Sequence, residues 1–400
     1  MSITELRPAR SRQALGTVST TALQASILVA FLAASAAPTP LYALYQEQWG
    51  LPSSAITVVF GVYALALLTA LLLVGQISDH IGRRPAILGA IALETASIAV
   101  FLTADSLGAL VAARVMQGLA TGAATGALGA ALLDTAPVRG PMVTSLAPMA
   151  GMAAGVLGSS ALVQYAPAPM RLVYAVLIVL LLLQAAAMLA TAESAERRPG
   201  VLASLRPHVT VPVPARRAML VAAPIDIAVW ALGGFYLSLG PSLATAVTDS
   251  NNPLIGGAAA FALTSSGAAA IFLLRTAPAL RVMLIGAPAL AAGVATTLAG
   301  VAFGASALFF AGTVLAGVGF GAGFQGALRT VVPLAAPHER AGLMSAFYVL
   351  SYLAMCLPAV TAGFAVDALP LTTVTNVYGA ALIILAVLAV LGTRAINRSS

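Results

Sequence analysis

An all-α membrane protein is the fold class that the sequence predicts, with twelve transmembrane helices in two pseudo-symmetric six-helix bundles. Three observations predict it: the apolar composition, twelve apolar runs of membrane-spanning length and the one-sided distribution of the arginines. Of the 400 residues, 60% are hydrophobic and 8% are charged, whereas about a quarter of the residues in soluble domains carry charge. The mean hydropathy is +1.00. This composition excludes a soluble globular domain.

Each apolar run is long enough to cross a bilayer, whose core of about 30 Å takes about 20 helical residues. The fifth, seventh, ninth and eleventh runs contain an internal proline, at Pro148, Pro224, Pro288 and Pro358. Membrane helices tolerate such prolines where neighbouring groups satisfy the freed backbone. The predicted spans are 18–40, 54–74, 86–103, 107–131, 141–164, 170–190, 218–242, 255–274, 281–301, 305–328, 342–366 and 373–392.

All nineteen basic residues are arginines, and their positions predict the orientation of the chain. Arg171 alone falls on one side of the twelve-span arrangement, and Arg114 falls within a span. Because cytoplasmic loops carry the excess of basic residues, we expect both termini in the cytoplasm and a multi-pass location in the plasma (inner) membrane. The net charge of +7 then reflects topology, and no nucleic-acid partner is expected. The other side holds Arg7, Arg10, Arg12, Arg83, Arg84, Arg139, Arg197, Arg198, Arg206, Arg216, Arg217, Arg275, Arg281, Arg329, Arg340, Arg394 and Arg398.

A polar loop between the second and third spans, residues 75–85, carries the most specific motif. It combines two glycines seven residues apart with one acid and two arginines: Gly75, Asp79, Gly82, Arg83 and Arg84. These residues resemble the loop signature of the major facilitator superfamily of transporters, roughly Gly-x-x-x-Asp-x-x-Gly-Arg-[Arg/Lys]. The resemblance implies the major facilitator fold, a small-molecule substrate and transport by alternating access.

A second segment, from Asp134 to Arg139, is similar to the acid-to-arginine segment that follows the fourth helix in this superfamily. The resemblance implies that Asp134 holds Arg83, and that Asp79 meets the positive N-terminal end of the eleventh span. Together with Arg139, these residues would form a cytoplasmic latch that favours the outward-open state. The alternative for Asp134 is an acid at a helix end beside a solvated loop.

The fourth span contains Arg114-Val115-Met116-Gln117-Gly118, which is similar to a further superfamily motif, Arg-x-x-Gln-Gly. On a helical wheel Gln117, Gly118, Thr121 and Thr125 all lie within about 60° of Arg114, so one polar stripe follows this helix. An arginine stays charged and can hold an anion or tune a neighbouring carboxylate. A permanent ion pair that locks the third and fourth spans together is the structural alternative.

Two acids fall within predicted spans, Glu94 in the third and Asp226 in the seventh. A carboxylate at mid-membrane costs about 2.5–3.5 kcal/mol on insertion scales, so both are candidates for proton coupling or substrate binding. Trp230 shares the Asp226 face, while Gln24 shares one face of the first span with Ser35. Helix packing is the alternative for these polar groups. The candidate coupling residues are Glu94, Arg114, Gln117, Asp226, Gln24 and Trp230. In the eleventh span Ser345, Tyr348, Tyr352 and Cys356 lie on one side, where packing is the expected role.

An internal repeat predicts two halves. Residues 113–122 align with residues 312–321 at an offset of 199, which pairs Gly118 with Gly317 and Gly122 with Gly321, while Thr313 replaces Arg114. The predicted division is an N-terminal bundle at 1–190, a cytoplasmic linker at 191–217 and a C-terminal bundle at 218–400. Duplicated halves of this kind place the substrate near mid-bilayer between them.

Gly151 and Gly155 of the fifth span partly resemble an antiporter motif, although Val156 replaces its proline and Ser159 and Ser160 replace its glycine pair. Close helix packing is the alternative, and physical grounds favour it for small residues four apart. The chain looks most like bacterial drug or sugar efflux permeases. We therefore expect proton-coupled efflux of a small, uncharged or cationic organic molecule by a monomer; the alternative is proton-coupled uptake of a sugar or organic acid.

Enzymatic and cofactor chemistry is not expected. The three histidines, at positions 80, 208 and 338, fall in predicted loops, and Cys356 is the single cysteine. No phosphate-binding loop appears, so no cofactor and no metal are expected, and a proton gradient is the predicted source of work.

Overall fold

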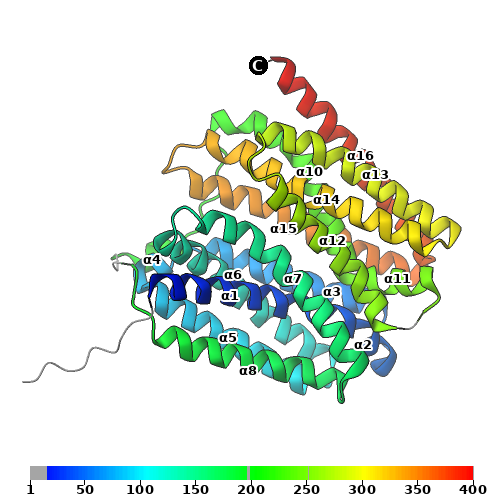
Figure 1. Cartoon of the computed structure of the whole chain (residues 1–400), viewed down its shortest axis with the longest axis horizontal. Coiled ribbons are helices and arrows are strands. Elements are labelled where there is room, and N and C mark those ends of the chain that lie inside the picture. Colours follow the sequence, from blue (N-terminus) through cyan, green and yellow to red (C-terminus); the bar gives the residue numbers. More distant parts are fainter. Residues whose placement is uncertain (1–15, 196–198, 251, 400) are drawn as a thin grey trace, which may run out of the picture.

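The computed structural model describes residues 16–195, 199–250 and 252–399, and these fold into helices without a strand (Figure 1). Twelve stretches are long and apolar enough to cross a membrane. The long helices are α1 (Thr17–Ala36), α3 (Ser53–Val74), α5 (Arg83–Thr103), α6 (Leu107–Thr135), α7 (Gly140–Tyr165), α8 (Pro169–Leu189), α10 (Val213–Ser238), α12 (Pro253–Leu273), α13 (Ala279–Phe303), α14 (Ser306–Val331), α15 (Arg340–Ala368) and α16 (Leu371–Ser399).

The predicted twelve spans are confirmed, and most of their ends agree within a few residues. The first span differs most, because it continues from α1 through η1 (Thr39–Leu41) and α2 (Tyr42–Trp49) to Trp49. The seventh begins at Val213, before the expected residue 218, so α10 takes in the end of the predicted linker. The four predicted internal prolines all lie inside helices.

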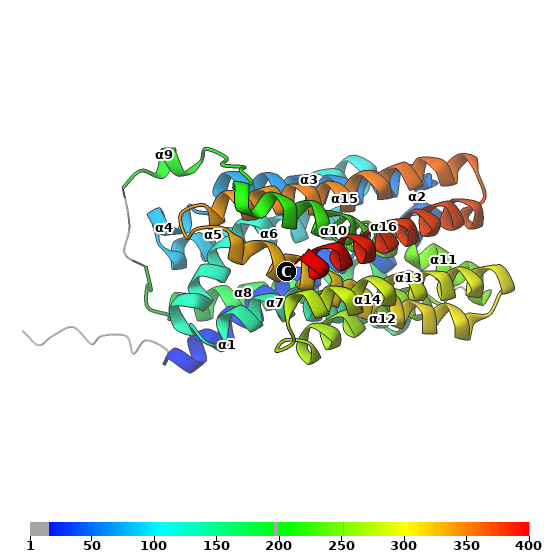
Figure 2. The same cartoon turned by 90° about the horizontal axis from the view of Figure 1, so that it is seen from above.

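The two largest hydrophobic cores of the described residues lie in separate halves of the chain. One core draws its buried residues from positions 27–188, and the other draws all but Met149 from positions 215–389. Figure 1 shows the two bundles one above the other, and Figure 2 shows the short α9 (Val201–Ser204) in the connection between them. The boundaries at 190 and 218 stay a prediction, and residues 196–198 of the linker lie outside the described ranges.

The repeated glycines pack equivalent pairs of helices. A Cβ on Gly122 would meet the carbonyl of Leu67 in α3 at 2.6 Å, and Gly118 packs on the neighbouring turn of the same helix. In the second half, Gly317 and Gly321 of α14 pack in the same way on α12. The glycines at an offset of 199 therefore allow the same close crossing of helices in both halves.

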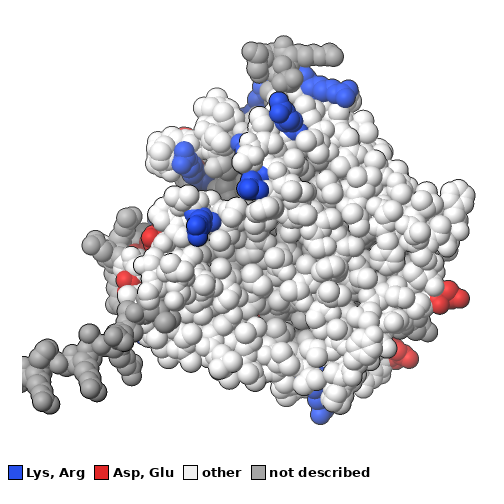
Figure 3. Space-filling view, viewed as in Figure 1, with Lys and Arg blue, Asp and Glu red and all other residues white. Residues whose placement is uncertain are grey.

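Charged side chains gather at the two ends of the bundles (Figure 3). We call the end that carries α4 (Ser78–Ile81) and the loops between α6 and α7 and between α14 and α15 the basic end. Arg83, Arg84, Arg139 and Arg340 lie there, whereas Arg171 lies at the start of α8, at the opposite end. Of the predicted basic residues, positions 7, 10, 12, 197 and 198 fall outside the described residues.

Candidate functional site

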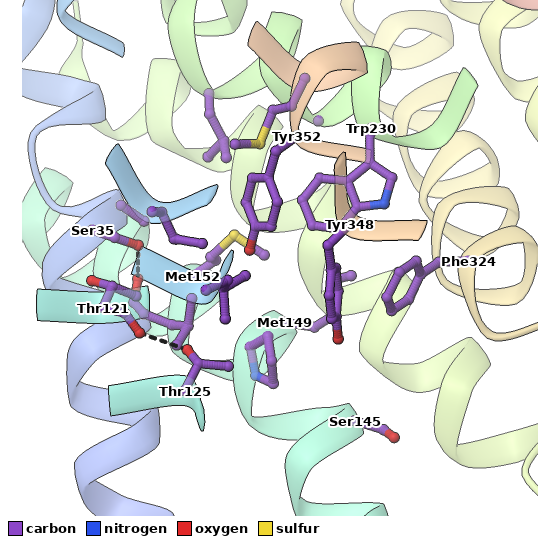
Figure 4. A pocket seen from close by; sticks show the side chains of 18 of the residues that line it. Ser35, Thr121, Thr125, Ser145, Met149, Met152, Trp230, Phe324, Tyr348 and Tyr352 are labelled. Carbon is purple, nitrogen blue, oxygen red and sulfur yellow. Dashed lines mark hydrogen bonds between the residues drawn. The ribbon is translucent and has the colours of Figure 1, made fainter. Parts of the chain in front are cut away.

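A cavity of about 380 Å³ lies between the two halves (Figure 4). Aromatic rings, leucines and methionines make up most of its wall, and no charged or amide side chain of the described residues lines it. Its first-half wall carries the hydroxyls of Ser35, Thr121 and Thr125. A pocket of this size and polarity suits a small organic molecule.

The second-half wall of the cavity is an aromatic cluster centred on Trp230 of α10. Its ring centroid lies 4.9 Å from that of Tyr352 and 5.6 Å from that of Phe324. Tyr348 continues the row, 6.1 Å from Tyr352. Tyr348 and Tyr352 were expected to serve packing, but both rings also line the cavity (Figure 4).

The cavity opens at the basic end. Leu133 at the end of α6 and Ser145 near the start of α7 both line it and are exposed. Met344, in the first turns of α15, lines the facing wall. The two halves are therefore apart at this end.

At the opposite end the halves are in contact. α3 packs on α15, where Gly61 faces Cys356 and Val360, and α7 packs on α12, where Gly257 faces Ser160. These contacts close the cavity on that side, so the structure gives access from the basic end.

The first span breaks beside the cavity, and the break explains the Arg114 motif. Pro38 and Pro40 have no N–H, so the carbonyl of Ala34 loses its helical donor four residues on. Gln117 Nε2 donates to that carbonyl at 3.1 Å, and Arg114 donates to the carbonyl of Ser35 at 2.8 Å. A buried carbonyl without a donor is costly, so these two side chains stabilise the break between α1 and η1.

Two further hydroxyls satisfy carbonyls at the breaks. The N–H of Leu41 bonds Pro38 O, which leaves the carbonyl of Ala37 without its helical donor. Ser159 of α7 donates to Ala37 O at 2.6 Å. Pro241 has no N–H and so frees the carbonyl of Leu237, and Thr39 donates to it at 3.1 Å from the other half. The broken ends of the first and seventh spans thus touch each other across the closed end of the cavity.

Arg114 is completely buried, and its partners are neutral. It donates to Tyr42 Oη and to Gln117 Oε1, the latter at 2.6 Å, and its guanidinium lies 5.1 Å from the ring centroid of Tyr63. The expected alternative, a direct ion pair with Glu94, is wrong: both ion pairs within the described ranges belong to Arg83. The reason is that the Gln117 amide lies between the two charges.

Glu94 of α5 is also completely buried. Gln117 Nε2 donates to its Oε1 at 3.1 Å, and its Oε2 has no hydrogen-bond partner. Gln117 therefore links the buried carboxylate of Glu94 to the carbonyl of Ala34 at the break between α1 and η1. Ser35, the next residue, lines the cavity. Glu94 itself does not line the cavity.

Asp226 of α10 is the second buried acid and lies behind the aromatic wall of the cavity. It is completely buried; Ser351 Oγ donates to its Oδ2 at 2.8 Å, while its Oδ1 has no hydrogen-bond partner. Trp230 follows one turn later on the same helix, and its indole N–H also lacks an acceptor. Ser351 sits in α15 between Tyr348 and Tyr352, so Asp226 is one hydrogen bond away from the helix that carries both cavity tyrosines.

Gln24 is buried near the basic end of α1, where its Oε1 accepts from Thr135 Oγ1 at 2.8 Å. This bond joins α1 to the end of α6. Gln24 does not line the cavity, so its contacts are those of helix packing.

The loop at residues 75–85 is held by two acids from other segments. Arg83 bonds Asp79 and donates through Nε to Asp134 Oδ2 at 3.1 Å, so the expected contact between Arg83 and Asp134 is formed. Glu193, which follows α8, accepts from the backbone N–H of Arg83 at 2.8 Å and of Arg84 at 3.1 Å. Its carboxylate thereby caps the N-terminus of α5.

The two loop glycines meet separate demands. Gly82 joins α4 to α5 with φ of 102°, a conformation that favours glycine, and a Cβ there would meet Glu193 Oε2 at 2.6 Å. Gly75 ends α3 against Gly126 of α6. Arg84 donates to Leu189 O at 2.6 Å, whereas Arg139 is exposed and takes part in neither ion pair of the described chain.

The expected contact between Asp79 and the start of the eleventh span is not formed. Asp79 bonds Arg83, and no hydrogen bond or ion pair of the described residues joins it to α15. The physical reason is that the halves are apart at the basic end, where the cavity opens.

Several partners of the site were not singled out from the sequence. Tyr42, Ser159 and Ser351 each bond a residue or carbonyl far away in the chain. The prolines at 38 and 40 were the one signal in the sequence that could have predicted such partners. Proline has no N–H, so carbonyls of the preceding turn need hydrogen-bond donors from other segments.

Comparison with known proteins decides the family. The model of the Major Facilitator Superfamily matches residues 25–359. The chain belongs to this superfamily. It is therefore a membrane transporter that works by alternating access, and its family groups it with transporters and not with enzymes.

Two solved structures of transporters share the fold at low sequence identity. A crystal structure of the nucleoside transporter NupG, in mutant form, matches with a TM-score of 0.72 and 12% identity over 92% of this chain and 98% of that chain. A bacterial homologue of the human lysosomal transporter Spinster, described as inward-facing and occupied, matches with a TM-score of 0.73 and 13% identity over 94% of this chain and 97% of that chain.

A curated relative matches over a short segment. Multidrug resistance protein D of Escherichia coli (strain K12) is 41% identical over 68 residues, which is 17% of this chain and 17% of that protein. The matched segment is well under two thirds of the relative, so its activity bears on this chain only as a proposal.

Proposed function

We propose that this chain is a proton-driven exporter of small amphipathic molecules that are neutral or cationic and contain aromatic rings. The observation that carries the proposal is the uncharged cavity between the halves, with Trp230 and Tyr352 in its wall and the buried Asp226 behind them. Aromatic faces attract flat organic groups and cations. The short match to a protein named for multidrug resistance supports the same substrate class.

The proposed proton sites are Asp226 and Glu94. Neither acid makes an ion pair with a described residue, although Arg114 lies one hydrogen-bonded side chain away from Glu94. Each acid is buried and has one carboxylate oxygen that lacks a hydrogen-bond partner. An ionised carboxylate within a membrane span carries a cost of about 2.5–3.5 kcal/mol, which a bound proton removes. Asp226 is the site beside the substrate wall, whereas Glu94 acts on the opposite wall through Gln117.

The proposed direction follows from the charge of the two ends. If the basic end faces the cytoplasm, as the positive-inside rule indicates, the open cavity loads from the cytoplasm and both termini lie there. The loop cluster of Gly75, Asp79, Gly82, Arg83, Arg84, Asp134 and Arg139 is then the proposed cytoplasmic gate. We propose that the chain acts as a monomer in the plasma membrane, because each half-to-half contact needed for the cycle lies within one chain.

The rival function is proton-coupled uptake of a sugar or an organic acid. An organic acid needs a cation in the cavity wall, and a sugar needs amide or carboxylate groups to bond its many hydroxyls. The wall offers neither, since its polar groups are hydroxyls and one indole. Export of an amphipathic molecule therefore agrees better with the lining.

Binding of an aromatic cation tests the proposal directly. Trp230 and Trp49 are the two tryptophans, and Trp49 stacks on Tyr45 at the end of α2, away from the cavity. In a Trp49→Phe protein the emission of Trp230 is expected to change saturably with tetraphenylphosphonium. Adding Tyr352→Ala should weaken this binding by about tenfold, because one ring of the wall is lost.

Choline is the matched probe: it carries the same charge without aromatic rings, so it keeps only the cation–π contact and should change the emission only at far higher concentrations than tetraphenylphosphonium. An emission that does not respond to tetraphenylphosphonium, or a Kd that Tyr352→Ala leaves unaltered, would contradict the proposed site.

A further inference from the structure

A charged side chain joins the two halves at the closed end of the transporter. Asp367, in the last turn of α15, accepts from the backbone N–H of Ser53 through Oδ1 at 2.8 Å and from that of Ser54 through Oδ2 at 3.2 Å. Ser53 and Ser54 are the first two residues of α3. One carboxylate from the second half thus caps a helix of the first half.

Local helix electrostatics oppose an acid at this position of α15. The C-terminal end of a helix carries partial negative charge, so an acid in the last turn destabilises its own helix. The N-terminal end of α3 offers the opposite charge and two backbone donors without helical acceptors. Its N-cap, Pro52, supplies no side-chain cap. The contact therefore stabilises both helix ends: the amides of α3 gain an acceptor, and the carboxylate of Asp367 gains donors.

The contact lies at the outer edge of the interface between α3 and α15, which we call the seam. The two helices must separate there when this end opens during alternating access. Below it, α3 and α15 touch through Thr57 and Gly363 and through Gly61, Cys356 and Val360. Opening this end of the cavity separates α3 from α15, and the carboxylate then loses both amide donors.

We infer that Asp367 is a gating residue, whose carboxylate clamps the start of α3 and stabilises the state that is closed at this end and open at the basic end. The inference goes beyond the proposed function, because it depends on neither the substrate, the proton sites nor the direction of transport. The clamp sets the fraction of molecules open at this end.

Cys356 is a natural reporter of that fraction. It is the single cysteine of the chain, it is 3% exposed and it lies in the seam against Gly61. Its thiol should react with a hydrophilic maleimide mainly in molecules whose seam has parted. The labelling rate of purified protein in nanodiscs then measures opening in the absence of any substrate.

Asp367→Ala removes both acceptors, and Asp367→Asn removes the charge while keeping one acceptor. We expect labelling of Cys356 to accelerate by about three- to tenfold with alanine and by a smaller factor with asparagine. Asp105→Asn is the control: Asp105 is an exposed acid in the loop before α6, at the same end, and should label at the wild-type rate.

The donor side offers a reciprocal variant. Ser53 is the first residue of α3, where helices accept proline, so Ser53→Pro deletes the shorter of the two bonds without breaking the helix. It should also accelerate labelling, and in the double variant with Asp367→Ala its effect should largely vanish. Wild-type labelling rates in both Asp367 variants, or additive effects in the double variant, would overturn the inference.

Discussion

Replacing Asp226 by asparagine is expected to abolish gradient-driven transport while leaving passive exchange of substrate intact. The asparagine has nearly the same volume and keeps an oxygen that accepts from Ser351, but it cannot exchange a proton. Coupling between two ligands is commonly worth 5- to 150-fold, so we expect proton-driven accumulation to fall by about tenfold or more. Proteoliposomes with and without an imposed pH gradient measure the two activities separately.

Asp105→Asn is the matched control for this experiment, because it removes an exposed acid that has no hydrogen bond or ion pair to another described residue. Glu94→Gln distinguishes the second candidate site. Intact proton-driven transport in both the Asp226→Asn and the Glu94→Gln proteins would refute the assignment of the proton sites.

A large loss of stability is expected for Gln117→Leu. The variant leaves the carbonyl of Ala34 without a donor, Arg114 without one acceptor and Glu94 without its hydrogen bond. Buried polar groups left without partners cost about 1–3 kcal/mol each, so we expect at least about 3 kcal/mol in total. The apparent Tm of the purified protein should fall by about 5 °C or more, and transport should fall with it because the break in the first span forms the cavity wall.

Gln184→Leu provides the comparison for that variant. Gln184 is also buried, in α8, but its amide makes one bond of 3.3 Å, to Ser26, and its carbonyl oxygen has no partner. A much smaller fall in Tm is expected. An equal fall in Tm for the Gln117→Leu and Gln184→Leu proteins would mean that the hydrogen bonds of Gln117 at the break contribute no more stability than the single bond of Gln184.

The spans were predictable because length and hydropathy alone decide whether a segment crosses a bilayer. The first span was predicted to end at residue 40, and the sequence did not show that η1 and α2 continue it to Trp49. The glycine repeat predicted the equivalent crossings of α6 on α3 and of α14 on α12. These features depend on local sequence and on close backbone contact.

The cavity was less predictable, because its lining depends on how each helix is rotated and on which end of the halves is open. Tyr348 and Tyr352 follow the spacing of a packing stripe, and nothing in that spacing distinguishes a ring in the core from a ring in a cavity wall. The expected contact of Asp79 with α15 belongs to a state closed at the basic end. The cap that Glu193 provides for α5 comes from a segment over a hundred residues away in the chain.

The two halves differ in the repeated motif, where the first has Arg114 and the second has Thr313, and their hydrogen bonds explain the difference. Thr313, at the position equivalent to Arg114, bonds Tyr236 Oη at 2.8 Å. Arg114 also bonds a tyrosine, Tyr42, but in addition it donates to the carbonyl of Ser35 beside the proline break. In the seventh span the carbonyl freed by Pro241 is served by Thr39, so a neutral threonine suffices at position 313.

Proton movement driven by substrate is the most direct test of proton-driven export. Wild-type protein is reconstituted in liposomes with a pH-sensitive dye inside and an imposed gradient, and tetraphenylphosphonium is added. Proton-driven export predicts that protons move opposite to the cation, that the gradient collapses faster than without it, and that Asp226→Asn removes the effect. Protons that move together with the substrate, or a gradient that does not respond to it, would contradict proton-driven export.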